Sequence, residues 1–359
     1  MRMASGSMPQ GGPGVTIGVD THGEVHVVAA FTSDLGRPLG HLEIPTTPPG
    51  YRRLLEWAHG FGTDLRFGIE GTGSYGAGLA RFLSDAGCSV IEVNRPNRQT
   101  RHARGKSDPV DAEAAARAVL SGEATGIAKG DQEHVGMIRA LRVARRSPVK
   151  TTTEIVNQMR ALIVAAPAEL REQLRQLPRA QLIAAAAAMR PGPITTLTAA
   201  VKLALKGLAQ RHQLLTDEIK ILDGELDRLT AEAAPKLRAL RGVGTDVAGA
   251  LLVAAGDNPE RLRSEAAFAR LCGVAPLPAS SGKTTGRHRL SRGGDRQANN
   301  ALWRIVMVRL AWHQPTKDYM ARRTREGLSK KDVVRCLKRY VAREIYRVLV
   351  PAVELATAA

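Results

Sequence analysis

The feature that most restricts the fold of this chain is an alternation of short apolar segments with helical segments between residues 15 and 122. Within residues 15–31, apolar residues alternate on both sides of a turn at Thr21–Glu24, which predicts two strands. Short apolar runs at 65–70 and 88–93 predict two more strands. Helices are expected from residue 51, after the glycine-rich turn at 71–76, and over 108–122. This order predicts an α/β layer domain with a mixed sheet.

Four acidic residues stand at the ends of these elements: Asp20, Glu70, Asp108 and Asp111. Asp20 and Glu70 each end a predicted strand, and neighbouring strands bring such ends to one edge of a sheet. Asp108 and Asp111 are three residues apart and share one face of a helix. Carboxylates that converge repel one another unless a cation neutralises them. Because hard oxygen ligands favour Mg²⁺ or Mn²⁺, the four acids predict a divalent metal site that can act on a phosphodiester.

Each acid except Glu70 also has a purely structural explanation. Asp108 precedes Pro109, which is typical of a helix N-cap, and Asp111 would then face the positive end of the helix dipole. Asp20 fits the start of a turn. Glu70 lies between a buried strand and a glycine-rich turn and has no such role, so the four together favour metal chemistry in an RNase-H-like domain.

The middle of the chain has a helical composition. Within residues 136–190, we expect interruptions at Pro148, Pro167 and Pro178. Residues 195–234 carry a heptad pattern, which predicts a coiled coil. Its seam consists of Val201, Leu205, Leu208, His212, Leu215, Ile219, Leu222, Leu226 and Leu229. This seam fits contact with a second chain or a helical hairpin within one chain.

Residues 236–256 read as a helix, a turn at Gly242–Gly244 and a second helix, similar to a helix-hairpin-helix. Such a turn presents backbone N–H groups at a helix N-terminus, where a phosphate can bind. An ordinary tight connection between helices has the same pattern. The rest of the chain, to about residue 350, reads as mainly helical with one loop.

Basic residues are concentrated toward the C-terminus. The chain has 52 Lys and Arg against 34 Asp and Glu, a net charge of +18. Residues 1–130 hold 13 of each sign, whereas residues 283–359 hold 18 basic and 6 acidic side chains. This imbalance predicts a polyanionic partner, with nucleic acid as the first candidate. The residues expected to contact nucleic acid are Arg101, Arg104, Lys106, Gly242, Gly244, Lys283, Arg287, Arg289 and Arg292.

A loop with two hydroxyls, Ser280-Ser281-Gly282, adjoins the last of these basic residues. A serine is a poor nucleophile until it is activated, and nearby cations can stabilise the pentacoordinate phosphorus that its attack would form. The attack would leave a phosphoserine ester that keeps the bond energy for rejoining. Ser281 is favoured over Ser280 because Gly282 lets a backbone approach closely. A flexible polar loop is the alternative interpretation.

Cysteine usage favours a reducing cytoplasm. Cys88, Cys272 and Cys336 are far apart and form neither a disulfide framework nor a CxxC pair. Residues 1–14 are rich in Gly, Pro and Ser, which predicts a flexible tail and no secretory signal. No apolar run approaches the roughly 20 residues that span a bilayer, so no membrane partner is expected.

The acids, the turn and the serine loop resemble those of insertion-sequence transposases with an N-terminal DEDD, RuvC-like domain and a C-terminal serine domain, also called bridge recombinases. The resemblance rests on IGVDTHG, GIEGTGSYG, KSDPVDAEAAARA, LRGVG and LCGVAPLPASSGKTTGRHRLSRGGDRQANNALWR. It implies that Asp20, Glu70, Asp108 and Asp111 bind Mg²⁺ and that Ser281 attacks DNA and becomes linked to it. It also implies a homo-oligomer (dimer or tetramer) at the bacterial nucleoid, with a structured bridge RNA that selects donor and target DNA.

These patterns predict four parts and one main function. The parts are a tail at 1–14, a RuvC-like metal domain at 15–135, a helical coiled-coil region at 136–235 and a mainly α serine domain at 236–350. The expected function is DNA transposition. The alternative is a metal-dependent nuclease, similar to Holliday-junction resolvases, in which water attacks the phosphate. An actin-like kinase is disfavoured because its second phosphate hairpin and Gly-Gly adenosine loop are not found in the sequence.

Overall fold

The computed structural model describes residues 14–93, 107–128, 134–258, 261–279, 288–290 and 293–350. The chain forms two compact units, one of residues 1–132 with 256–263 and one of residues 133–255 with 264–359. The helical middle and the C-terminal part lie in the second of these units, and the domain boundaries expected at residues 135 and 235 stay predictions. Across the described ranges, we find no helix with the length and apolar character to cross a membrane.

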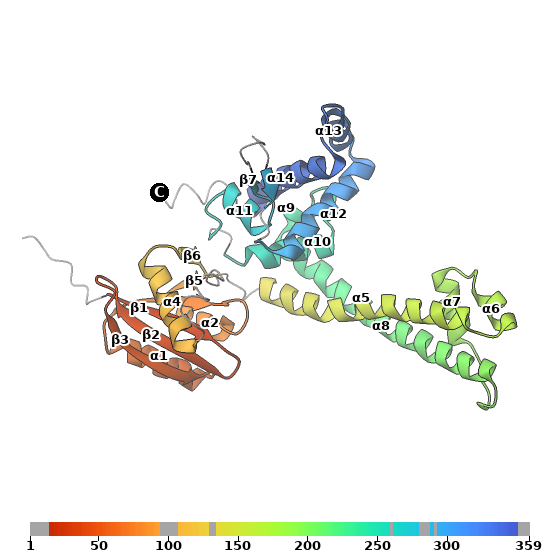
Figure 1. Ribbon diagram of the computed structural model, residues 1–359, viewed down its shortest axis with the longest axis horizontal. Coiled ribbons are helices and arrows are strands. Elements are labelled where there is room, and N and C mark those ends of the chain that lie inside the picture. The colour runs from red at the N-terminus through yellow and green to blue at the C-terminus, as the bar shows by residue number, and fades with distance from the viewer. Residues whose placement is uncertain are drawn as a thin grey trace, which may run out of the picture. The chain divides into compact units, whose positions relative to one another are not determined.

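The first unit is built on a six-stranded mixed sheet (Figure 1) with strand order β3-β2-β1-β4-β5-β6. The strands are β1 Gly14–Thr21, β2 Val25–Thr32, β3 Pro38–Pro45, β4 Asp64–Glu70, β5 Ser89–Val93 and β6 Gly126–Ile127. β1 is antiparallel to β2 and parallel to β4, and β4 is parallel to β5. The mixed sheet is consistent with the expected RNase-H-like domain.

Helices cover both faces of this sheet. Helices α1 (Pro48–His59) and α2 (Ala77–Asp85) pack on the face that carries Ile17 and Phe67. Helix α4 (Asp108–Leu120) packs on the other face, where Ala112 and Ala116 join Val27, Ala29 and Phe31. Because side chains alternate along a strand, residues next to Ile17 and Phe67 in sequence face α4.

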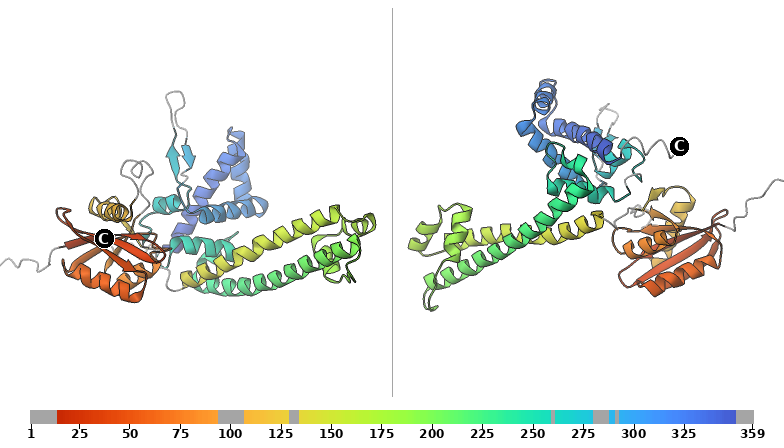
Figure 2. Two further views of the ribbon diagram at one scale, coloured as in Figure 1. Left: turned by 60° about the horizontal axis from the view of Figure 1, so that its bottom comes forward. Right: turned by 180° about the vertical axis from the view of Figure 1, so that it is seen from behind.

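The second unit begins with a long helical pair, α5 (His134–Val164) and α8 (Leu197–Ala233), which lie side by side (Figure 2). The shorter helices α6 (Ala168–Leu174) and α7 (Arg179–Ala187) join them. Pro167 and Pro178 are the N-caps of α6 and α7, as expected for helix breaks. The expected break at Pro148 is wrong, because α5 continues through this buried proline. We attribute this to the packing of α5 along α8, which offsets a cost of about 3 kcal/mol for an interior proline.

The heptad seam of α8 is used within the chain. Val201 and Leu205 are buried in a core with Ile155, Met159 and Leu182 of α5 and α7. His212, also on the seam, is buried and receives a hydrogen bond from Arg179 Nη2 at 2.9 Å. The seam therefore packs within the chain as a helical hairpin, which was one of the two expected arrangements. A coiled coil between two chains stays a prediction.

The C-terminal part of the second unit is helical with one two-stranded sheet. Its elements are α9 Pro235–Arg238, α10 Thr245–Ala255, α11 Glu265–Leu271, β7 Pro276–Pro278, β8 His288–Leu290, α12 Arg296–Trp312, α13 Gln314–Arg325 and α14 Lys330–Leu349. β7 and β8 pair antiparallel, with Pro276 opposite Leu290. The two strands flank the segment that carries the serine loop in sequence.

Candidate metal centre

The sheet brings the first two acids to the same edge. β1 and β4 are parallel neighbours in which Val19 pairs with Ile69, so Asp20 and Glu70 follow at equivalent positions. Asp20 is only 8% exposed, and Glu70 is partly buried. The Thr21 hydroxyl donates a hydrogen bond to the Glu70 backbone oxygen at 2.9 Å, which ties the two strand ends together.

Two glycines allow α4 to lie directly on the sheet beside these acids. Gly18 and Gly68 are paired across β1 and β4, and each lies two residues before an acid on the same face. A Cβ on Gly18 would lie 2.0 Å from the Ala112 oxygen. A Cβ on Gly68 would lie 3.0 Å from the Ala115 oxygen. A side chain at Gly18 in particular would hold the helix away from the sheet.

The first turn of α4 carries the other two acids. The structure places the N-cap at Ser107, one residue before the expected cap at Asp108. Asp108 is therefore the first helical residue and is partly buried. Asp111, one turn along, is buried at 8% exposure. The cap expected at Asp108 is wrong, and its carboxylate instead lies close to a histidine at the end of β1.

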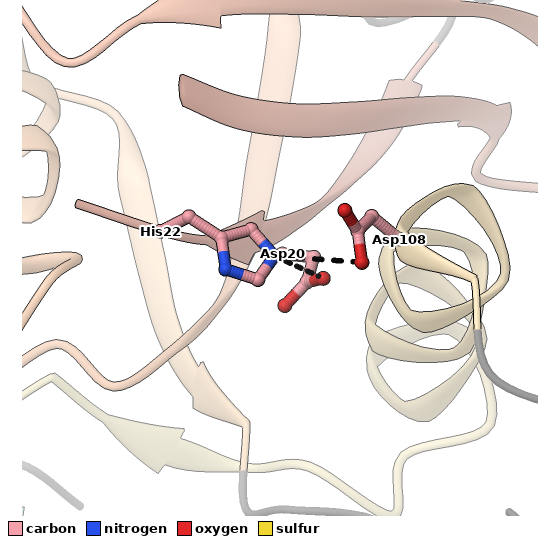
Figure 3. Close-up of side chains that lie close together, drawn as sticks. All are labelled: Asp20, His22 and Asp108. Carbon is pink, nitrogen blue, oxygen red and sulfur yellow. Dashed lines mark hydrogen bonds and ion pairs between the residues drawn. The ribbon is translucent and has the colours of Figure 1, made fainter. Parts of the chain in front are cut away.

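That histidine is His22, which the sequence analysis did not identify as part of the site. Its Nε2 lies 3.1 Å from Asp20 Oδ2 and 3.6 Å from Asp108 Oδ1 (Figure 3). Ligand atoms of Asp20, His22 and Asp108 all lie within 4.8 Å of one another. The sequence did contain a signal for His22. It lies two residues after Asp20, where the strand ends, and side chains two residues apart along a strand point to the same face.

Electrostatic interactions place Asp111 and Glu70 in the same region as Asp20. Burial raises the pKa of Asp20 above its usual value, His22 lowers it in part, and the charges of Asp111 and Glu70 raise it further. Asp111 and Glu70 therefore lie close enough to Asp20 to repel its charge. The native fold holds Asp20 in a position that disfavours its own ionised form, and a divalent cation bound there would offset the repulsion among these carboxylates.

A buried histidine supports the turn that carries His22. The backbone N–H of His22 donates to Nδ1 of His26 at 3.3 Å. The His26 ring is fully buried and stacks on Tyr51, with 6.0 Å between ring centroids. Burial, with a smaller contribution from His22, lowers the pKa of His26 to about 4. His26 is therefore neutral at pH 7 and can accept this hydrogen bond.

The residues present fit a divalent ion. Carboxylate oxygens suit Mg²⁺ and Mn²⁺, and the additional imidazole nitrogen suits Mn²⁺ better than Mg²⁺. Asp20 and Asp108 offer oxygens within reach of one another, and the charge near Asp20 is crowded enough to need neutralisation.

Most of the other expected site residues are outside the described ranges. These are Ser281, Arg101, Arg104, Lys106, Lys283, Arg287 and Arg292, whereas Arg289 lies in β8. Gly242 and Gly244 lie between α9 and α10. Gly242 has φ +87° and packs closely on Ile305 of α12, which gives it a structural role. Its role in phosphate binding stays a prediction.

Comparison with known families gives two matches. A model described as a DEDD transposase of the IS110 type matches residues 17–166, which include all four acids. A second model, described as a transposase of the IS116/IS110/IS902 family, matches residues 234–321, which include Ser281. A comparison with curated proteins found no match.

Proposed function

The chain belongs to the IS110 family of insertion-sequence transposases, and from this premise we propose that it cuts and rejoins DNA with a DEDD metal site and a nucleophilic serine. As a DNA transposase, it must break a phosphodiester and keep the broken end for transfer. The proposed ligands are Asp20, Glu70, Asp108 and Asp111. The proposed nucleophile is Ser281.

The observation that carries this proposal is the convergence of acids from three separate segments at one edge of the sheet. The end of β1 supplies Asp20, the end of β4 supplies Glu70, and the first turn of α4 supplies Asp108 and Asp111. A divalent ion bound there would neutralise charge on the scissile phosphate and its leaving oxygen. The carboxylates would fix the position of the ion, and His22 would hold Asp20 and Asp108 in place before binding.

In the proposed chemical step, the Oγ of Ser281 attacks the scissile phosphorus. A new Oγ–P bond forms, and the P–O bond to one deoxyribose oxygen breaks. The serine proton passes to solvent, and the leaving deoxyribose oxygen takes a proton from solvent. Attack by a deoxyribose hydroxyl on the phosphoserine reverses these changes and joins the strand, so no external energy source is needed.

The proposed nucleic-acid partners and the oligomeric state rest on the positive charge of the chain and on its family. We propose donor and target DNA as substrates and a structured bridge RNA as the guide. The basic side chains around Ser281 and before Asp108 would contact their phosphates. We also propose a homo-oligomer, a dimer or a tetramer, at the nucleoid of a bacterial cytoplasm.

Covalent trapping tests the chemistry. Full-length protein is mixed with labelled element-end DNA and Mg²⁺ or Mn²⁺, denatured, and separated by electrophoresis. Wild type and the matched control Ser280→Ala should give a protein–DNA adduct, whereas Ser281→Ala and Glu70→Gln should give none. DNA cutting by Ser281→Ala at the wild-type rate, without an adduct, would instead support the resolvase-like nuclease in which water attacks.

A further inference from the structure

A cavity of about 770 Å³ lies in the second unit against α13, α14 and the β7–β8 sheet. Pro276 of β7 and His288 of β8 form part of its wall. Its arginines are Arg322, Arg323, Arg335, Arg339 and Arg343.

The guanidinium groups are held in place but not fully neutralised. Glu265 pairs with Arg343 at 3.0 Å and also with Arg339. Asp332 pairs with Arg335 at 2.7 Å, and Glu326 pairs with Arg322 and Arg323. Among the described residues, these five guanidinium groups pair with three carboxylates, which leaves an excess of two positive charges. The lowered pKa of Arg339, which burial and then Arg343 cause, agrees with this crowding of positive charge.

Two tyrosines line the same cavity. Tyr319 and Tyr340 meet edge to face, with 5.5 Å between ring centroids. Arg322 lies 5.3 Å from the centroid of Tyr319, and Arg343 lies 5.8 Å from that of Tyr340. Tyr340 is 50% exposed, which leaves part of this residue open to a ligand. Exposed aromatic rings next to arginines are the combination that binds a base by stacking and a phosphate by charge.

The shape of the site selects the form of the nucleic acid. In a duplex the faces of the bases are stacked on their neighbours, and only base edges and phosphates are open to a protein. A tyrosine within a cavity can stack on a base only if that base leaves the helix or belongs to a single strand. The combination of cavity, rings and arginines therefore fits an unpaired nucleotide better than a duplex.

We propose that this cavity binds an unpaired nucleotide, with its base against Tyr340 and its phosphate on the surrounding arginines. This inference rests on the proposed function and deepens it, because β7 and β8 flank in sequence the segment that carries Ser281. A nucleotide held here would lie against Pro276 of β7 and His288 of β8. DNA and RNA share the base and phosphate that the site recognises, and the test below separates them.

Cysteine labelling gives a direct readout, because Cys336 lines the cavity and is partly exposed. Full-length protein is labelled with a maleimide, and the rate at each cysteine is followed by mass spectrometry. Cys88, in the first unit, is the internal control in the same molecule. Cys272 is fully buried, with a pKa raised to about 12 by burial and by Asp295, so its labelling should be slow.

The probes are a short single-stranded DNA, the matching RNA and the matching DNA duplex. We expect saturating single strands to slow labelling of Cys336 at least about fivefold and to leave Cys88 unchanged. The stronger of the DNA and RNA effects identifies the natural occupant. Unchanged labelling of Cys336, or equal protection by the duplex, would overturn the proposal.

Substitutions separate this cavity from other basic surfaces. Tyr340→Leu should weaken single-strand binding about tenfold, since stacking contributes about 1–3 kcal/mol per base. Arg335→Gln should reduce the slope of log affinity against log salt by about 0.7. The matched control is Arg347→Gln on the exposed side of the same helix, which should change neither value. Equal behaviour of Tyr340→Leu and wild type would also overturn the proposal.

The same assays separate this inference from the proposed chemistry. Ser281→Ala should keep the protection of Cys336 although it forms no DNA adduct. An adduct without protection would reject the cavity and leave the serine chemistry standing. Protection without any adduct in wild type would reject the serine chemistry and leave the cavity standing.

Discussion

Asp20 is the residue at which stability and proposed function oppose each other. Its carboxylate is buried, and the charges of Asp111 and Glu70 add to the cost of ionising it, although His22 offsets part of that cost. A raised pKa in the native state means that the protonated form stabilises the fold. This stabilisation is lost as the pH rises through the raised pKa.

Asp20→Asn should therefore be more stable than wild type at pH 7 in the absence of metal, because asparagine cannot ionise. Thermal unfolding should show a rise of a few degrees in the transition of the first unit, and the difference should shrink in acid. Mn²⁺ at about 100 times its Kd should stabilise wild type by about 2.7 kcal/mol and have no effect on the variant. Asp85→Asn, at an exposed position, is the control. A variant that is less stable at pH 7, or that Mn²⁺ still stabilises, would contradict this assignment.

At the scale of elements, the position of α4 depends on the glycine pair. Gly18→Ala keeps all four acids but places a methyl group where the Ala112 oxygen lies. We expect the first unit to lose about 1–3 kcal/mol of unfolding free energy, and Mn²⁺ affinity to fall at least tenfold, because Asp108 and Asp111 move with the helix. Calorimetric titration and denaturant unfolding measure these effects. Gly126→Ala in β6, where a Cβ would be no closer than 3.6 Å to its neighbours, is the control. Unchanged Mn²⁺ affinity in Gly18→Ala would show that this contact does not position the acids.

In the second unit, Asp246 links three helices. Asp246 lies in α10 and forms ion pairs with Arg142 of α5, at 2.5 Å, and with Arg304 of α12. Burial raises the pKa of Asp246, but the two arginines, with a smaller effect of Arg145, lower it more, so the net pKa lies below the usual value. The ionised Asp246 therefore stabilises the native state when the pH is above the usual carboxyl pKa. This stabilisation is lost as the pH falls through the lowered pKa of Asp246.

Asp246→Asn should destabilise the second unit by about 1–3 kcal/mol, because it leaves the partly buried Arg142 guanidinium without its carboxylate partner. The loss should appear in urea unfolding at pH 7 and should diminish in acid, where wild type also loses the pair. Asp318→Asn, on the exposed part of α13, is a suitable control. Equal stability of Asp246→Asn and wild type at pH 7 would refute the role of this link.

Sequence patterns predicted the secondary structure where neighbouring residues alone determine it. Alternation in residues 15–31 predicted β1 and β2, and Pro167 and Pro178 predicted the breaks that precede α6 and α7. β3 was missed because it is an edge strand with mostly partly buried and exposed residues and no clear alternation. Pro148 was misread because the packing of α5 on α8 is not local.

In the candidate site too, contacts between distant parts of the chain could not be predicted from local sequence patterns. The four acids could be proposed because each has a distinct place at the end of an element. His22 could not be assigned from its own segment, because its second partner, Asp108, is supplied by a helix far along the chain. The glycine pair also gains its meaning only from the register of β1 with β4.

For the whole molecule, charge makes a prediction that does not depend on any single site. With a net charge of +18, the chain should bind DNA with an affinity that falls steeply with salt. About six phosphate contacts would lower the affinity about 10³-fold between 50 and 200 mM salt. Fluorescence anisotropy with a labelled duplex measures this dependence, and a flat response would show that the basic residues do not bind phosphates.

The central claim is that acids from β1, β4 and α4 form one metal centre in the first unit. Anomalous diffraction from crystals of the full-length protein with Mn²⁺ tests it most directly. We predict an anomalous peak among the carboxylates of Asp20, Glu70, Asp108 and Asp111, and its loss in Asp20→Asn crystals treated in the same way. No peak among these carboxylates, at a Mn²⁺ concentration that supports DNA cutting, would contradict the account.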